Sequence, residues 1–228
     1  MSDYLLYCFA QSGNAYRVAL MLNLIGADWK PQWLDFFSAG VQRKPEYRED
    51  INEMGEVPVL VDGTKKLTQS GVILTYLARK TGKFMPQGED QELESLRWII
   101  FDNQKVNGFL GPMRFLMNFA KPAGDPAVIT FLKDRAQGNL AIVNKRLENS
   151  PFLIGDKPTI ADISMTGYLY YPVEEFGFDI AKDFPAIGAW LERIKALPGW
   201  GHPYDLMPGY PFGTQGFRNQ RPQQSSWP

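Results

Sequence analysis

Cysteine and histidine are almost absent from this chain: its 228 residues include one of each, Cys8 and His202. A single cysteine excludes an intramolecular disulfide and a Cys-x-x-Cys redox pair, and the two residues cannot form a structural zinc site. His202 lies in a segment rich in glycine and proline, which argues against a histidine-based triad. We therefore expect no metal, a merely structural Cys8, and thiol chemistry only with a thiol from another molecule.

The chain also lacks an excess of charge and a long apolar run. Its 24 basic and 25 acidic residues give a net charge of -1, so no positive surface for nucleic acid or an anionic membrane is expected. No run approaches the roughly 20 apolar residues of a membrane span, and residues 1–9 do not resemble a signal peptide. We expect a cytoplasmic protein, with no nucleic acid and no membrane as partner.

What the sequence has is an ordinary globular composition, 44% hydrophobic, in two different patterns. In residues 1–82, short strands alternate with helices. The expected elements are a strand over Tyr4–Phe9, a helix over 13–25, a strand over Trp29–Leu34, an irregular stretch over 42–53, strands over Val57–Asp62 and Lys66–Thr68, and a helix from Ser70 to Gly82. Pro31 places its strand toward a sheet edge. Beyond residue 90, helical periodicity replaces the strand signals.

Residues 83–90 read as a linker, residues 91–198 as an all-helical domain and residues 199–228 as an irregular, aromatic-rich tail. A long helical pattern over 91–120 should bend at its glycines and proline, Gly108, Gly111 and Pro112. The next helix has an apolar face made of Val128, Leu132, Ala136, Leu140, Val143 and Leu147. The tail either straps over the helices or, over 220–228, is disordered.

Thr159 and Asp162 have the spacing of a helix N-cap. The Thr159 hydroxyl lies at a helix start and the Asp162 carboxylate follows three residues later, as in a capping box with Asp in place of Glu. A cap satisfies N–H groups that have no partner inside the helix. We therefore assign both residues to folding and not to a functional site.

A ligand site is indicated by a proline at a strand and by the start of the next helix. Pro58 cannot donate to a sheet ladder, so its strand must lie at an edge or begin beside a turn. With a cis Val57–Pro58 bond, the N–H and C=O of Val57 would face outward and pair with an extended ligand. Gln69 and Ser70 begin the next helix, whose unpaired N–H groups attract a carboxylate. This spacing predicts a site for a small peptide-like ligand.

At these residues the sequence resembles the cytosolic glutathione transferase family, and the resemblance extends over most of the chain. It implies an α/β thioredoxin-like N-terminal domain plus an all-α helical C-terminal domain, with glutathione as co-substrate. It also implies that Val57, beside Pro58, pairs with the cysteinyl unit of glutathione, and that Gln69 and Ser70 hold the γ-glutamyl carboxylate. A homodimer is implied, with the helix after Ser70 and the long helix after the linker near its interface.

Activation of the glutathione thiol is assigned to Ser12. Lowering a thiol pKa of ~8.5 by two units requires ~2.7 kcal/mol of preferential thiolate stabilisation. Ser12 lies between the first strand and the first helix, where its O–H can donate to the sulfur and the helix start adds its field. The segment Ser12–Val18 resembles bacterial, serine-type members of the family, with Asn14 as the second choice. The simpler alternative is that Ser12 only caps the helix.

Two departures from the family pattern leave other functions open. Zeta-type isomerases carry a Ser-Ser-Cys cluster where this chain has Ser12-Gly13-Asn14, so a zeta-like glutathione-dependent isomerase is an alternative and not the first interpretation. Glu56 would repel an anionic ligand unless a cation such as Arg43 or Lys44 offsets it. A non-catalytic member of the fold that binds a protein partner is therefore a further alternative.

The favoured prediction is a detoxification enzyme in which the glutathione thiolate attacks a small apolar electrophile. Its predicted glutathione-binding residues are Ser12, Asn14, Lys44, Glu56, Val57, Pro58, Gln69 and Ser70. Ala10, Phe36 and Met113 are candidate walls for the electrophile between the domains, although each also suits a core. Asp102 could approach the ligand of a partner subunit, but an exposed helix carboxylate is the simpler interpretation.

Overall fold

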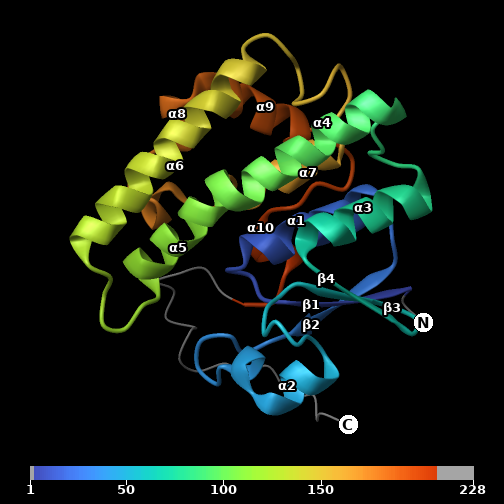
Figure 1. Cartoon of the computed structure of the whole chain (residues 1–228), viewed down its shortest axis with the longest axis vertical. Coiled ribbons are helices and arrows are strands. Elements are labelled where there is room, and N and C mark those ends of the chain that lie inside the picture. The colour runs from blue at the N-terminus through green and yellow to red at the C-terminus, as the bar shows by residue number, and fades with distance from the viewer. Residues whose placement is uncertain (1–2, 210–228) are drawn as a thin grey trace.

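The computed structural model describes residues 3–209, and its secondary structure changes from mixed to helical along the chain (Figure 1). The first part contains β1 (Tyr4–Cys8), α1 (Gly13–Leu24), β2 (Trp29–Trp33), the 3₁₀ turn η1 (Val41–Arg43), α2 (Pro45–Asp50), β3 (Val59–Asp62), β4 (Lys65–Thr68) and α3 (Ser70–Thr81). The observed order of strands and helices is the predicted one, with bounds shifted by one or two residues in most elements.

The four strands form one mixed sheet in the order β2-β1-β3-β4. β1 pairs parallel with β2 and antiparallel with β3, which in turn pairs antiparallel with β4. Pro31 therefore lies in an edge strand, as predicted. Pro58 does not, because β3 is an interior strand that begins at Val59, directly after the cis Val57–Pro58 bond. Of the two predicted placements of Pro58, the one beside a turn is correct.

The second part is helical. It contains α4 (Gly88–Phe101), the π-helical turn η2 (Asp102–Val106), α5 (Asn107–Asn118), α6 (Pro126–Leu147), α7 (Ile160–Met165), the 3₁₀ turn η3 (Val173–Glu175), α8 (Ile180–Asp183), α9 (Pro185–Lys195) and α10 (Pro203–Leu206). The α4–α5 run is irregular at η2, earlier than the predicted Gly108, Gly111 and Pro112, which lie within α5. A π-turn adds a residue to one helical turn, and here it precedes the proline.

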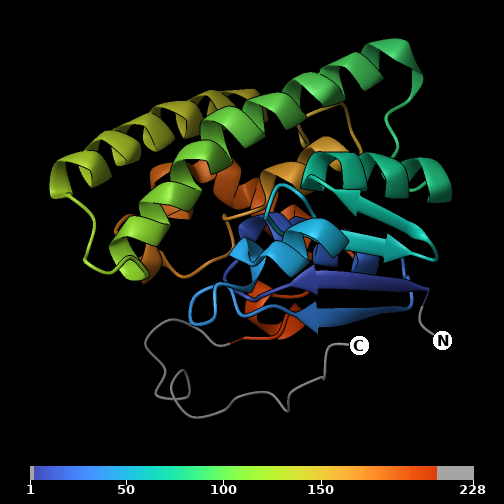
Figure 2. The same cartoon turned by 60° about the horizontal axis from the view of Figure 1, so that its bottom comes forward.

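Helices α1 and α3 lie between the sheet and the long helices, and α2 lies on the opposite face of the sheet (Figures 1 and 2). Ten of the 12 residues of α1 are buried, because this helix packs on the sheet on one side and on the helical domain on the other. One continuous hydrophobic core therefore runs through both domains. The position of the α1 N-terminus depends on both of them.

The predicted apolar face of α6 is only partly correct. Ala136, Leu140 and Val143 are fully buried, whereas Val128 is 46% exposed because it lies in the first turn of α6, at an end of the bundle (Figure 1). The predicted cap of α7 is confirmed: Thr159 Oγ1 accepts from the Ala161 N–H, and the Thr159 N–H donates to Asp162 Oδ2 over 2.9 Å.

The first part of the predicted tail packs on the body of the protein. α10 contacts α1, and Trp200 and Tyr204 pack against the main core. The rest of the strap predicted for 199–228, and the terminal stretch over 220–228, lie outside the described part of the chain. Within residues 3–209, no helix is both long and apolar enough to cross a membrane.

Candidate functional site

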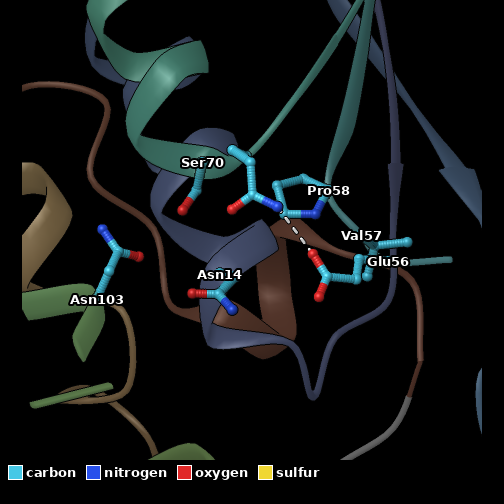
Figure 3. Close-up of a pocket in the computed structure, with 7 residues that line it drawn as sticks. Asn14, Glu56, Val57, Pro58, Ser70 and Asn103 are labelled. Atoms are coloured by element: carbon cyan, nitrogen blue, oxygen red, sulfur yellow. Dashed lines mark hydrogen bonds between the residues drawn. The ribbon is translucent and has the colours of Figure 1, made fainter. Parts of the chain in front are cut away.

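A small pocket forms where the segment before β3 meets the first turns of α1 and α3 (Figure 3). It is lined by Asn14, Glu56, Val57, Pro58, Gln69, Ser70 and Asn103. Six of the eight residues predicted to bind glutathione thus come together around one space. Ser12 and Lys44 are not part of its lining, and Asn103 was not predicted.

Val57 offers a free backbone edge to the pocket. The β1–β3 pairing begins at Val59, so Val57 lies outside the sheet ladder. No hydrogen bond among residues 3–209 uses the N–H or the C=O of Val57. The carbonyl of the preceding residue, Glu56, is held by the Tyr47 hydroxyl at 2.8 Å and by Asn52 Nδ2 at 2.9 Å. An extended ligand could therefore pair with a fixed, unpaired peptide edge.

The start of α3 forms the second side of the pocket. Ser70 is the first residue of this 12-residue helix and is buried, and the first-turn N–H groups of a helix have no intrahelical partner. Gln69, which precedes it, has a φ of 63°, in the left-handed region that a non-glycine residue rarely occupies. Such outliers gather at ligand sites. This geometry suits a carboxylate at the helix N-terminus.

The third side of the pocket comes from Asn103 in η2. Its Nδ2 donates to the Ile99 carbonyl at 2.8 Å, and its Oδ1 accepts from Arg17 Nη1 at 3.1 Å. Arg17 also binds Asp102 at 2.8 Å. The sequence gives no signal that Asn103 lines a pocket, because it is an ordinary polar residue in a helical pattern. Its position depends on Arg17, 86 positions away.

The structure corrects the prediction for Asp102. This side chain is fully buried and accepts hydrogen bonds from Arg17, Ser164 and Asn107, so it is neither an exposed carboxylate nor able to reach a ligand of another subunit. Burial raises the pKa of Asp102 to about 6, against the opposing effects of Arg17 and of the hydroxyl of Ser164. The π-turn at η2 directs Asp102 inward and leaves Asn103 at the pocket.

Ser12 and Asn14 occupy different positions at the start of α1. Ser12 is the N-cap: its Oγ accepts from the Ala15 N–H at 3.1 Å, as the simpler alternative stated. Asn14 is the second residue of α1 and lines the pocket, and its Oδ1 is buried and has no hydrogen-bond partner within the described residues. In Figure 3 the Asn14 side chain extends into the space between Asn103 and Glu56. A bound ligand would satisfy this unpaired amide.

Gly13, between these two residues, separates this site from the zeta type. A Cβ at this position would lie 2.6 Å from the Tyr168 ring and 2.7 Å from the Gly167 carbonyl oxygen. Both distances are far below van der Waals contact. A serine at position 13, as in a Ser-Ser-Cys cluster, therefore does not fit against the helical domain.

The structure does not place Lys44 beside Glu56 to offset its charge. Glu56 Oε2 accepts from Gln69 Nε2 at 2.9 Å, whereas Lys44 is exposed and serves as the N-cap residue of α2 outside the pocket lining. The Glu56 carboxylate is thus paired with an amide instead of a cation. Its hydrogen bond joins the Val57 side of the pocket to the α3 side.

The three predicted electrophile-site residues have different surroundings. Ala10 and Met113 are completely buried and offer no surface to a ligand, so they belong to the core. Phe36 is half-buried and stacks on Phe9, within an aromatic cluster that continues through Phe37 to Phe119 at the end of α5. This cluster bridges the two domains. Among the described residues, no group of three or more acidic, histidine or cysteine side chains could hold a metal ion.

Fold and pocket together define a two-domain protein whose thioredoxin-like domain presents a small pocket between an unpaired peptide edge and two helix N-termini. The family model described as glutathione S-transferase, N-terminal domain, matches residues 2–79, and the one described as glutathione S-transferase, C-terminal domain, matches residues 119–198. The chain belongs to the glutathione S-transferase family, which confirms the resemblance found in its sequence and the predicted fold class.

Individual relatives show the range of this family. The disulfide-bond oxidoreductase YfcG of Escherichia coli (strain K12) is 32% identical over 203 residues, which cover 85% of this chain and 91% of that protein. A glutathione S-transferase of Pseudomonas fluorescens Pf-5 has a TM-score of 0.80 at 28% identity and covers 89% of this chain and 99% of its own. A glutathione transferase of Burkholderia graminis, solved with two glutathione molecules per subunit, has a TM-score of 0.75 at 26% identity, covering 87% and 85%.

Proposed function

We propose that the pocket binds glutathione and that the protein is a glutathione transferase, which uses the glutathione thiol to attack a small apolar electrophile. The observation that carries this proposal is the convergence of three ligand-binding features: the unpaired Val57 peptide, the α3 N-terminus at Ser70 and the unpaired Asn14 amide. In this arrangement Val57 pairs with the cysteinyl unit and Ser70 with the γ-glutamyl carboxylate. The glutathione bound to the Burkholderia relative supports the choice of ligand.

Thiol activation is assigned to the start of α1. The Ser12 hydroxyl accepts from the Ala15 N–H and still carries its own donor, which can point to a sulfur anion. The Nδ2 group of Asn14, as distinct from its unpaired Oδ1, can add a second donor, and the helix start adds a partial positive charge. Two donors and a helix terminus can supply the ~2.7 kcal/mol that a two-unit fall in thiol pKa requires.

Calorimetric titration with glutathione tests the ligand. We expect a dissociation constant in the micromolar to low millimolar range, weakened at least fivefold by Ser70→Ala or Gln69→Ala, because each removes part of the carboxylate site. Thr130→Ala is a matched control, since this exposed hydroxyl on α6 bonds only a helix carbonyl. No heat of binding from the folded protein would reject the proposal and favour the non-catalytic alternative, a scaffold that binds a protein partner.

Ser12→Ala tests the thiol assignment. It removes a cap and a sulfur donor, so turnover of an activated aryl halide should fall at least tenfold while glutathione affinity changes little. Thr159→Ala is the control, because it removes an N-cap of the same kind from α7, outside the pocket lining. Equal losses in the two variants would leave Ser12 with a capping role alone and move the assignment to Asn14.

A second candidate function is reduction of disulfides, supported by the 32% identity to a disulfide-bond oxidoreductase. The only cysteine, Cys8, is buried, so the chain itself has no accessible thiol. Both electrons must then come from glutathione: two glutathione molecules reduce one disulfide to two thiols and leave as oxidised glutathione. The two glutathione molecules in the Burkholderia relative are consistent with this stoichiometry. Parallel rates with a small dialkyl disulfide and an aryl halide would rank the two activities.

We also propose that the protein is a cytoplasmic homodimer. Leu93, Leu96 and Ile100 lie on one face of α4 and are 48–59% exposed, and Val72 on α3 is 55% exposed. Sedimentation should show a dimer that Leu96→Glu dissociates. Ile142→Glu on α6, at a side chain that is 51% exposed, should leave the dimer intact. A monomer at all concentrations would contradict the proposal.

A further inference from the structure

The loop that carries Ser12 is held from outside its own domain. The Ala10 carbonyl accepts from the Tyr171 hydroxyl at 2.6 Å, and the Gln11 carbonyl accepts from Arg114 Nη1 at 2.6 Å. The Ala10 N–H donates to the Pro208 carbonyl at 2.8 Å. Arg114 belongs to α5, Tyr171 follows α7, and Pro208 follows α10. The helical part of the chain thus fixes the peptide groups immediately before the α1 N-terminus.

Arg114 is itself fixed by a closed network. It is 2% exposed, its Nε donates to Glu175 Oε2 at 2.5 Å and its Nη2 donates to the Tyr204 hydroxyl at 3.0 Å. The Tyr204 hydroxyl in turn donates to Glu175 Oε1 at 2.6 Å. The guanidinium also lies 4.0 Å from the centre of the Tyr171 ring. Every nitrogen of Arg114 is therefore used, and its Nη1 has one fixed direction.

The Gln11–Ser12 peptide is held at both ends. Its oxygen binds Arg114, and its N–H, which belongs to Ser12, donates to the Phe9 carbonyl at 3.0 Å. The negative end of this peptide dipole is therefore directed to a buried cation in the helical domain. A sulfur anion at the α1 N-terminus would be repelled by a carbonyl that turned toward it.

We propose that Arg114 and Tyr171 are positioning residues of the thiol site, which hold the Ala10 and Gln11 carbonyls so that Ser12 and the α1 N-terminus face the sulfur. This inference rests on the proposed glutathione activity and extends it to the helical domain. Burial raises the pKa of Tyr171 well above its usual value, which keeps its hydroxyl protonated as a donor. Neither residue lines the pocket, so both act through the loop.

Adjacent tyrosines provide a matched test. Tyr171→Phe removes the donor to the loop, whereas Tyr170→Phe removes a donor at 2.7 Å to the Leu191 carbonyl in α9. The bound thiolate is followed by its ultraviolet absorbance against pH, together with kcat and KM. We expect Tyr171→Phe to raise the bound thiol pKa by about half a unit and lower kcat about threefold, with KM for glutathione unchanged. Tyr170→Phe should change neither.

Arg114→Lys is the second variant, because a lysine cannot reproduce the planar fork. We expect a loss of about tenfold in kcat, again without a change in KM. Should Arg114→Lys fail to fold, Tyr171→Phe still tests whether the helical domain positions the loop before Ser12. Unchanged thiol pKa and kcat in a folded Tyr171→Phe protein would overturn the inference while leaving the proposed function intact. A wild-type protein that binds no glutathione would overturn both.

Discussion

Two buried ion pairs support the pocket, one through a side chain and the other through a backbone carbonyl. Arg17 pairs with Asp102, both fully buried, and orients Asn103. Arg114 pairs with Glu175, with side chains 3% and 4% exposed, and holds the loop before Ser12. Arg114 uses all of its nitrogens. Arg17 uses Nη1 alone, and its Nε and Nη2 have no partner within the described residues.

The difference shows that burial and pairing do not by themselves decide how much an ion pair contributes to the free energy of unfolding. Removing two charges from water costs several kcal/mol, and the pair recovers this only when its remaining donors and acceptors are bonded. At Asp102 the cost of burial exceeds the effect of Arg17, since the pKa of the carboxyl is raised to about 6. The pair with the more complete hydrogen bonding should therefore lose more when only its charge is removed.

The largest effect is expected from Asp102→Ala, which breaks the first pair completely. Arg17, Ser164 and Asn107 would lose their common acceptor, so the free energy of unfolding should fall by about 3–5 kcal/mol. Urea denaturation measures it. The double variant Arg17→Met with Asp102→Leu should recover most of the loss, because it removes both charges. A loss below about 1 kcal/mol would show that the pair is solvated.

The next effect concerns pH. Because the pKa of Asp102 is raised from 3.8 to about 6 in the folded protein, its contribution to stability is present below pH 4 and is lost as the pH rises through 6. This loss should amount to about 2–3 kcal/mol. Asp102→Asn should abolish that part of the pH dependence in urea titrations between pH 4 and 7. Burial also raises the pKa of Asp162 to about 6. Because Asp162 is present in both proteins, its contribution cancels when their pH dependences are compared.

Isosteric neutralisation compares the two pairs directly. Glu175→Gln leaves Arg114 buried without a counter-charge, and we expect it to lower the free energy of unfolding at pH 7 by about 2 kcal/mol. Asp102→Asn at the same pH should cost less than half as much, because the ionised carboxylate is already disfavoured at that site. The reverse ranking would contradict the distinction drawn between the pairs.

The smallest effect is expected from Asn103→Ala. This change removes the side chain that joins the Arg17–Asp102 ion pair to the pocket. Glutathione affinity should fall about fivefold, or about 1 kcal/mol, through loss of one hydrogen bond, with kcat unchanged. Thr130→Ala is the matched control, because this exposed α6 residue also donates to the carbonyl four residues before it. Equal affinities in the two variants would exclude Asn103 from the ligand site.

The fold and much of the pocket were predictable because their signals are local. Val57, Pro58, Gln69 and Ser70 lie within 14 positions of one another, joined by a hairpin that holds them at a fixed spacing. The cap formed by Thr159 and Asp162 likewise depends on a separation of three residues.

The predictions that the structure contradicts concern residues whose surroundings depend on contacts between distant segments. Asp102 is buried because Arg17, 85 positions earlier, approaches it across the domain boundary, and no periodicity in either helix records this. The prediction for Lys44 rests on charge alone, which carries no information on the direction of α2. Val128 follows the apolar spacing of α6 but lies at an end of the bundle, where it stays 46% exposed.

The burial of Cys8 has a consequence for covalent labelling. This side chain is completely buried in the central strand β1, and burial raises the pKa of its thiol, so the reactive anion is scarce in the folded protein. Alkylating reagents can modify it only when the sheet opens, which makes the rate of labelling a measure of opening. Reactive electrophiles in solution therefore meet no accessible cysteine on the folded chain.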